Sequence, residues 1–246
     1  MRLKISLHKK NCRFPLNYQY LIQGMIYDSL PKEPEGSFYH DVGYSTGEKK
    51  YKMFVFSNLI GKNHIDITNR TITFNEDFLL FFASEDEGLV RSVYRFFQNN
   101  QKICIGKEIV DVIQTDLIDN PYFKGKKTVT VRTLSPLVAY RTDNNYVTYY
   151  RPSSHEFEEL VLSNLKNKMA ALHLDDNPDL KIDEVISEKK RMIHYKNTFY
   201  ESYFAVIQIS TDCRTLSLLL NTGISAKGSA GFGMLEVIHE KDFLSL

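Results

Sequence analysis

Two stretches of this chain gather the residues best suited to chemistry. The segment GISAKGSAGFGM, residues 223–234, holds four of the twelve glycines found in 246 residues. Such a cluster indicates a tight turn or a backbone laid against a ligand, because glycine permits positive φ and close approach. The segment FYHDVGYSTGEKKYK, residues 38–52, is polar and contains His40. Histidine exchanges a proton near neutral pH and loops often carry catalytic groups, so His40 is a candidate acid or base.

The glycine segment does not fit two well-known phosphate-binding patterns. A Walker loop places Lys and then Ser or Thr directly after its second spaced glycine. Gly223 and Gly228 have that spacing, but Ser229 and Ala230 follow instead. A helical pattern precedes the loop and a strand-like run follows it, which reverses the order of a Walker loop and of a dinucleotide fingerprint. Neither function is expected.

The composition is that of an ordinary globular protein. Hydrophobic residues make up 43% and charged residues 25%, with a net charge of +1 that favours no class of partner. No stretch has the length of a membrane span, and the N-terminus lacks a signal-peptide core. The three cysteines, Cys12, Cys104 and Cys213, are scattered and show no metal-ligand spacing. We expect a soluble cytoplasmic protein without a metal, a cofactor or a membrane association.

The elements that must position these residues follow a recognisable order. RLKISL (2–7) alternates as a half-buried strand, and PLNYQYLIQGMIYDSL (15–30) has helical spacing ended by a proline. KMFVFSNLI (52–60) and HIDITNRTITF (64–74) indicate strands, the second bent at Asn69. A helix with an acidic start is predicted from Asn75 to Gln98, and a strand over 102–116. This is the β-α-β-β-α-β order of a ferredoxin-like domain.

The second half repeats that order after a turn-rich segment at 119–127. Strands are predicted at 128–140 and 146–152, a helix from Ser153 to Leu174, two or three strands within 179–210, a helix at 211–223 and a strand at 233–240. The sequence therefore predicts an α+β protein of two tandem ferredoxin-like (RRM-like) domains, residues 1–120 and 121–246, with a C-terminal glycine-rich loop.

The ends of the chain together resemble a known family. The loop ends in Gly231-Phe232-Gly233 after a small-residue run containing Lys227, which is similar to the glycine-rich loop of the RAMP superfamily of CRISPR systems. PLNYQYLIQGMIYDSL, with KYKMFVFSNL (50–59) after it, resembles the CRISPR-associated endoribonuclease family (the sixth Cas family) that processes precursor CRISPR RNA. One departure is Ser225, which stands where the family's first Gly-apolar-Gly has a glycine, so we expect a stiffer first turn.

The resemblance implies a specific reaction. Members of the family cut repeat RNA without a metal, by attack of a ribose 2′-hydroxyl that leaves 2′,3′-cyclic phosphate and 5′-hydroxyl ends. By position, His40 matches the family's catalytic histidine, Tyr27 a tyrosine at the scissile site, and Lys52 a lysine that stabilises the developing charge. Which of His40 and Tyr27 is acid or base is left open. The absence of an acidic metal cluster from the sequence favours this route.

Under this interpretation the partner is CRISPR repeat RNA, and its binding is separate from its cutting. The loop residues Lys227, Gly228, Ser229, Gly231 and Gly233 are predicted to approach the RNA or to support the cleft between the domains. The alternative is a turn needed only for packing. Lys189, Lys190 and Arg191 lie between two predicted strands, where a basic hairpin tip would reach phosphates.

Two other functions stay open from the sequence. One is a RAMP-fold protein that holds guide RNA without cutting it, for which His40, Tyr27 and Lys52 together would be unnecessary. The other is an unrelated ferredoxin-like interaction protein. The repeat sequence, its form as hairpin or single strand, a homodimer and membership of an interference complex are likewise open.

Overall fold

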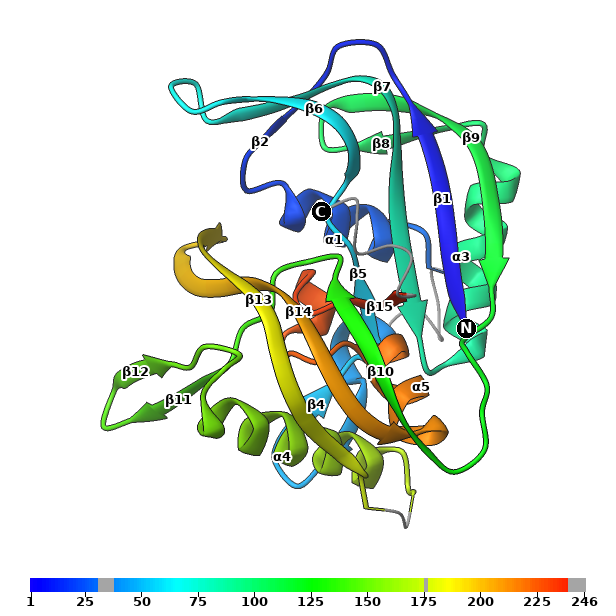
Figure 1. Ribbon diagram of the computed structural model, residues 1–246. Coiled ribbons are helices and arrows are strands. Elements are labelled where there is room, and N and C mark those ends of the chain that lie inside the picture. The colour runs from blue at the N-terminus through cyan, green and yellow to red at the C-terminus, as the bar shows by residue number, and fades with distance from the viewer. Residues whose placement is uncertain (31–37, 175–176, 239–246) are drawn as a thin grey trace.

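The computed structural model describes residues 1–30, 38–174 and 177–238. Those residues form two large antiparallel sheets, one in the upper and one in the lower part of Figure 1, together with two small two-stranded sheets. The N-terminal half contains β1 (Arg2–His8), β2 (Cys12–Pro15), α1 (Gln19–Asp28), η1 (Phe38–Val42), β3 (Tyr44–Thr46), β4 (Lys49–Tyr51), β5 (Phe54–Phe56), β6 (Ile60–Asp66), β7 (Thr71–Ser84), α3 (Glu87–Asn99), β8 (Lys102–Ile105) and β9 (Glu108–Ile118). The C-terminal half contains β10 (Lys126–Thr133), β11 (Tyr140–Asp143), β12 (Tyr146–Tyr149), α4 (His155–Ala171), β13 (Leu180–Tyr195), β14 (Thr198–Asp212), α5 (Cys213–Thr222), η2 (Gly228–Ala230) and β15 (Leu235–Ile238).

Both halves have the ferredoxin-like topology. In the N-terminal sheet, β1 and β7 are central, β9 pairs with β1, and β5 and β6 pair with β7. In the C-terminal sheet the order is β13-β14-β10-β15. Each half therefore runs β-α-β-β-α-β, and the predicted fold class is confirmed. The predicted domain boundary at residue 120 lies in the connection between β9 and β10 and stays a prediction.

The helix predicted from Asn75 is wrong. Residues 75–84 continue β7, in which Phe78, Leu80 and Phe82 are buried at every second position. This period of two, together with the strand preference of aromatic residues, outweighs the helical spacing that the same apolar run also offers. The helix α3 begins only at Glu87, after the N-cap residue Asp86.

Two single strands predicted from the sequence are hairpins. The expected bend at Asn69 is a reversal between β6 and β7, in which the Asn69 backbone N–H and its Nδ2 donate to the Asp66 carboxylate at 2.9 and 2.7 Å. The predicted strand over 102–116 reverses at Gly106 into β8 and β9. In both places a turn residue was counted as part of a continuous strand.

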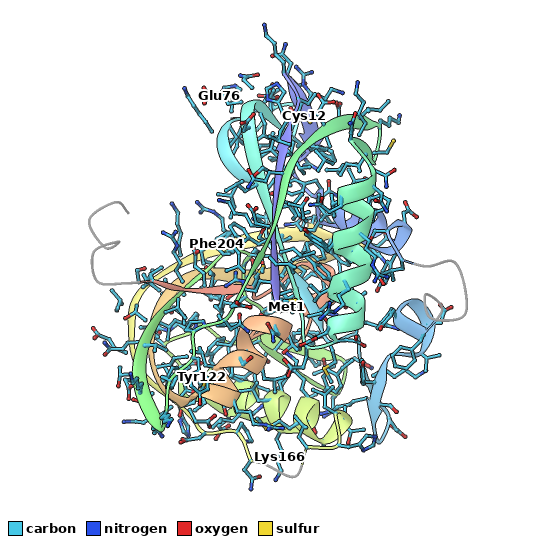
Figure 2. The ribbon with its side chains drawn as sticks, turned by 90° about the vertical axis from the view of Figure 1, so that its right-hand side faces the viewer. Met1, Cys12, Glu76, Tyr122, Lys166 and Phe204 are labelled. Atoms are coloured by element: carbon cyan, nitrogen blue, oxygen red, sulfur yellow. The ribbon has the colours of Figure 1, made fainter. Side chains whose placement is uncertain are left out.

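The two halves meet through a small shared core. Val55 and Ala83 of the N-terminal sheet pack with Leu134 and Met234 of the C-terminal half. The two halves are also joined by a hydrogen bond from the Met1 amino group to Asn221 Oδ1 at 3.0 Å, and Figure 2 shows Met1 above α5. In the described part of the chain, no helix is long and apolar enough to cross a membrane.

Candidate active site

The segment that carries His40 is anchored at one carboxylate. His40 lies in the single turn η1, and its side chain is outside the described part of the structure. The Tyr39 hydroxyl donates to Asp86 Oδ2 at 2.9 Å, and the Tyr44 hydroxyl donates to the same oxygen. Asp86 Oδ1 accepts the Leu89 backbone N–H at 3.1 Å and so caps α3. One side chain thus ties the residues on both sides of His40 to the first turn of α3.

Asp86 was missed by sequence reasoning. Burial alone raises the pKa of Asp86, but hydrogen bonds from Tyr44, the Leu89 amide and Tyr39 outweigh it and hold the pKa below its ordinary value. The carboxylate is therefore an acceptor for all of them at neutral pH. The available signal was Asp86 in front of Glu87, a helix-start pattern that the misplaced helix concealed.

Tyr27 lies near the end of α1 and is half-buried. Its ring meets Phe54 edge-on, with centroids 5.9 Å apart at 83°. Burial, and then the nearby Asp41 carboxylate, raise the pKa of Tyr27 above its ordinary value. The phenol is therefore protonated at neutral pH, in a form that donates a hydrogen bond or a proton.

Lys52 lies directly before β5 and shares a neighbour with Tyr27. Burial lowers the pKa of Lys52, the Asp41 carboxylate raises it, and Lys50 lowers it further. Asp41 thus acts on both Tyr27 and Lys52, and it is the residue after His40. The charge of Asp41 in η1 therefore affects one group near the end of α1 and another just before β5.

This arrangement combines a protonated phenol with a cation beside a histidine-bearing turn. Groups of these types can transfer protons and stabilise negative charge that develops on a bound anion. Within residues 1–30, 38–174 and 177–238, no three His, Cys, Asp or Glu side chains form a group that could hold a metal ion. The roles of the three predicted catalytic residues stay predictions.

The glycines of the loop have a packing requirement. A Cβ on Gly231, where φ is +82°, would lie 2.5 Å from the Phe56 ring. A Cβ on Gly228 would lie 2.6 Å from the Thr222 carbonyl oxygen and 2.9 Å from that of Phe54. No side chain fits at such distances, so the loop lies directly on β5 of the other half. Gly228, Gly231 and Gly233 are buried, and their contact with RNA stays a prediction.

Ser225, the departure from the family pattern, is also buried in this packing. Its Oγ accepts the Val138 backbone N–H at 2.8 Å, and a Cβ on Gly233 would come within 2.5 Å of that oxygen. The Ile224 N–H donates to the Gly233 carbonyl at 2.9 Å. Ser225 therefore ties the first turn of the loop to the segment that follows β10.

Lys227 and Ser229 are the two predicted loop residues that are partly exposed. The Lys227 ammonium lies 5.2 Å from the Tyr200 ring centroid and 5.8 Å from that of Tyr140, within the range of cation–π attraction. The Ser229 carbonyl accepts Gln23 Nε2 of α1 at 2.6 Å. The loop therefore contacts both an aromatic cluster and the helix that carries Tyr27.

A buried lysine that sequence reasoning missed holds the start of the loop. Lys168 of α4 is 4% exposed, and its Nζ donates to the Thr222 carbonyl and hydroxyl, both at 3.1 Å, and to the Gly223 carbonyl at 2.7 Å. Burial lowers the pKa of Lys168 to about 7. A lysine in an amphipathic helix gives no sequence signal of such a role, because it looks like a solvated residue.

The basic run at 189–191 lies within β13, not at a hairpin tip as predicted. The turn between β13 and β14 is at Lys196 and Asn197. Lys189, Lys190 and Arg191 are exposed, and Lys190 forms an ion pair with Glu201 at 2.6 Å. β13 continues through these residues with polar side chains on its exposed face. A run of polar residues is also typical of a loop, so the sequence did not distinguish the two.

Arg191 lines a groove of about 560 Å³ between the two halves. Arg70 lines it from the N-terminal half. Phe199, 62% exposed, and His194 stack in the groove with centroids 4.5 Å apart. Phe199 and His194 belong to the same β13–β14 hairpin as Arg191, whereas Arg70 lies more than one hundred residues earlier, so only the tertiary structure shows that Arg70 shares this surface.

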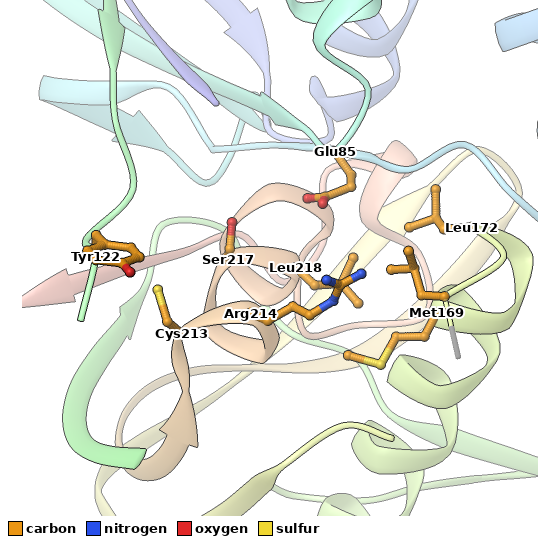
Figure 3. Close-up of a pocket in the computed structure, with 9 residues that line it drawn as sticks. Glu85, Tyr122, Met169, Leu172, Cys213, Arg214, Ser217 and Leu218 are labelled. Carbon is orange, nitrogen blue, oxygen red and sulfur yellow. The ribbon is translucent and has the colours of Figure 1, made fainter. Parts of the chain in front are cut away.

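A further cavity of about 500 Å³ lies between the end of β7, α4 and α5. Figure 3 shows Glu85 above Ser217 and Arg214 of α5, with Met169 of α4 and Leu172 just after it on the apolar side. Of the predicted site residues whose side chains are described, none lines this cavity. It is separate from the cluster around Asp41.

Comparisons with known proteins find a family to which this chain is similar. Residues 118–237 match the family model for the C-terminal part of CRISPR-associated protein Cas6. The resemblance to the Cas6 family that the sequence predicts is confirmed. The CRISPR-associated endoribonuclease Cas6 of Pyrococcus furiosus is 21% identical over 231 residues, which covers 92% of this chain and 84% of that protein.

Solved structures agree on the fold. A Cas6-related protein from Pyrococcus furiosus superposes with a TM-score of 0.81 at 19% identity, covering 98% of this chain and 99% of its own. A RAMP protein described as binding different RNA substrates gives 0.78 at 18% identity, covering 97% and 100%. The match to the Cas6 C-terminal model includes the whole glycine loop, so the resemblance seen in that loop is confirmed.

Proposed function

We propose that the chain is a metal-independent endoribonuclease that cuts CRISPR repeat RNA in precursor transcripts to give guide RNAs. The observation that carries this proposal is that the charge of Asp41, the residue after His40 in η1, acts on the pKa values of both Tyr27 and Lys52. The similarity to the Cas6 endoribonuclease of Pyrococcus furiosus supports it. The groups present suit a reaction that moves protons and stabilises charge on a phosphate.

In the proposed reaction the ribose 2′-oxygen attacks the adjacent phosphorus, and the bond from phosphorus to the 5′-oxygen breaks. The proton of the 2′-hydroxyl passes to a base, and the leaving 5′-oxygen takes up a proton. The products carry a 2′,3′-cyclic phosphate and a 5′-hydroxyl. His40 and Tyr27 share the proton transfers, and the raised pKa of Tyr27 keeps its phenol protonated at neutral pH. Lys52 stabilises the charge on the phosphate oxygens.

The RNA contacts proposed outside this centre use charge and aromatic rings. Lys227 and Ser229 lie at the surface of the loop, whereas Gly228, Gly231 and Gly233 shape its backbone. Lys189, Lys190 and Arg191 supply positive charge along β13, and Arg191 opens onto the groove lined by the stacked Phe199. Basic grooves with aromatic rings bind single-stranded RNA through phosphate contacts and base stacking.

The test is cleavage of an end-labelled precursor carrying the repeat of the protein's own CRISPR locus, in excess EDTA. We expect one cut by the wild type, loss of that cut in His40→Ala by about a hundredfold or more, and unchanged RNA binding by that variant. Cleavage surviving in His40→Ala would remove His40 from the site. Tight binding without a cut by the wild type would favour a protein that only holds guide RNA.

A further inference from the structure

A cavity of about 340 Å³ lies beside the proposed catalytic centre, and we name it the α4 pocket. Its walls include Lys50 and Tyr51 of β4, Tyr140 of β11, Asn164 and Asn167 of α4, and Ala226 of the glycine loop. Both halves of the molecule and the loop therefore contribute to it. Figure 1 shows β4 lying next to α4.

The α4 pocket is within reach of the scissile site proposed above. Lys50 is two residues from Lys52, so their Cα atoms are at most about 7 Å apart, and the charge of Lys50 lowers the pKa of Lys52. A nucleotide whose phosphate lies at Lys52 can thus place its own base, or the neighbouring one, in the pocket.

Asn164 supplies a group that lacks a partner in the free protein. It lines the pocket, and its Oδ1 is shielded from solvent without a hydrogen bond. Such an orphaned acceptor costs about 1–3 kcal/mol. The terminal torsion of asparagine is broad and nearly two-fold, so rotation turns either end of the carboxamide towards the pocket. A ligand edge with an adjacent donor and acceptor would restore the missing hydrogen bond.

The remaining walls suit the other parts of a nucleotide. Lys49 and Lys50 are exposed at the pocket, and in the described part of the chain neither pairs with a carboxylate. Tyr140 provides an aromatic ring, and Lys227 lies 5.8 Å from its centroid. Rings stack with bases, and lysines bind phosphates.

We propose that the α4 pocket seats one nucleobase of the RNA within two nucleotides of the cut, read by the carboxamide of Asn164. The inference rests on the proposed endoribonuclease function and adds to it a determinant of where the RNA is cut. Asn164 is a specificity residue in this proposal and takes no part in proton transfer.

The test compares Asn164→Ala with the matched control Thr115→Val. Thr115 of β9 is buried and its Oγ1 also lacks a partner, but it does not line the pocket. Each variant removes an orphaned polar atom, so both should be at least as stable as the wild type. Only Asn164→Ala should lower kcat/KM for repeat RNA, by about tenfold.

The decisive readout is a set of repeat RNAs with a single abasic nucleotide at each position flanking the mapped cut. At one position, the abasic nucleotide should lower the kcat/KM of the wild type and of Thr115→Val about tenfold. It should change the kcat/KM of Asn164→Ala little, because that variant has already lost the contact with the base. If all three proteins were equally sensitive at every position, or if Asn164→Ala had the kcat/KM of the wild type, the proposed role of the pocket would be overturned. The proposed endoribonuclease function would be unaffected. Failure of the wild type to cut repeat RNA would overturn both.

Discussion

The glycine loop and the His40 segment are held in place by opposite means. The loop at 223–234 is buried except at residues 226, 227 and 229, and its backbone packs so closely on β5 that Gly228 and Gly231 leave no room for a side chain. The segment at 38–52 is mostly exposed or partly exposed, and its residues Tyr39 and Tyr44 are fixed by hydrogen bonds to Asp86. Main-chain packing tolerates no added atom, whereas a side-chain anchor can be weakened in steps.

The contrast matters for the proposed function. A loop that joins the halves must keep one geometry, because it supports both α1 through Ser229 and the wall of the α4 pocket through Ala226. The segment with His40 has to admit RNA, so a local anchor at its edge is sufficient.

The largest effect is expected from Gly231→Ala. Its Cβ would overlap the Phe56 ring, and the backbone at φ +82° is unfavourable for alanine, so we expect a loss of about 3 kcal/mol in the free energy of unfolding. Gly125→Ala is the matched control, because Gly125 has φ +70° and open space around it. It should cost about 1 kcal/mol. Urea unfolding measures both, and equal losses would show that close packing does not hold the loop.

A smaller effect is expected from Lys168→Met at the start of the loop. The substitution keeps the apolar stem but leaves the Thr222 and Gly223 carbonyls without their donor, at a cost of about 2 kcal/mol. Thermal or urea unfolding at pH 7 measures it. A variant as stable as the wild type would mean that the three hydrogen bonds only offset the burial of the ammonium.

The free energies of unfolding of the wild type and of Lys168→Met should diverge as the pH rises. The pKa of Lys168 is about 7 in the folded protein and 10.5 ordinarily, so the unfolded chain binds more protons between these values. Wild-type stability therefore rises relative to Lys168→Met as pH increases from about 7 to about 10.5. A stability difference that is constant over this range would contradict the burial of a titrating ammonium.

The order of the elements could be predicted from the sequence, but the strand pairing that decides between helix and strand could not. Period-two and helical spacing identified most elements, and their order was sufficient for the ferredoxin-like topology. The helix predicted from Asn75 failed because alternation in Phe78, Leu80 and Phe82 belongs to a strand buried on one face. A local window contains both patterns, and only pairing of β7 with β1 decides between them.

The site was predictable in part for a similar reason. The glycine cluster marked the loop, but its close contact with Phe54 and Phe56 depends on how the two halves pack, which no local pattern contains. Asp86 accepts hydrogen bonds from residues more than forty positions away in the His40 segment, and Asn164 shares the α4 pocket with residues more than one hundred positions away. Residue type and spacing find loops and helix faces, whereas such anchors become visible only with the tertiary contacts.

The smallest effect on stability is expected from Asp86→Ser. This variant also tests the His40 segment most directly. Serine still caps α3, but its short side chain cannot hold Tyr39 and Tyr44, so stability should change by less than about 1 kcal/mol. Loosening the turn with His40 should lower RNA cleavage about tenfold at unchanged RNA affinity, because small misplacements of catalytic groups are costly.

Asp212→Ser is the control for this variant. Asp212 caps α5 through the Thr215 backbone N–H at 2.8 Å, and its substitution alters an equivalent N-cap without touching the His40 segment. We expect a similar change in stability and wild-type cleavage. A tenfold loss in both variants would assign the effect to helix capping in general, and cleavage unchanged in Asp86→Ser would show that the segment keeps its geometry without this carboxylate. Only a loss confined to Asp86→Ser supports a side-chain anchor that positions His40.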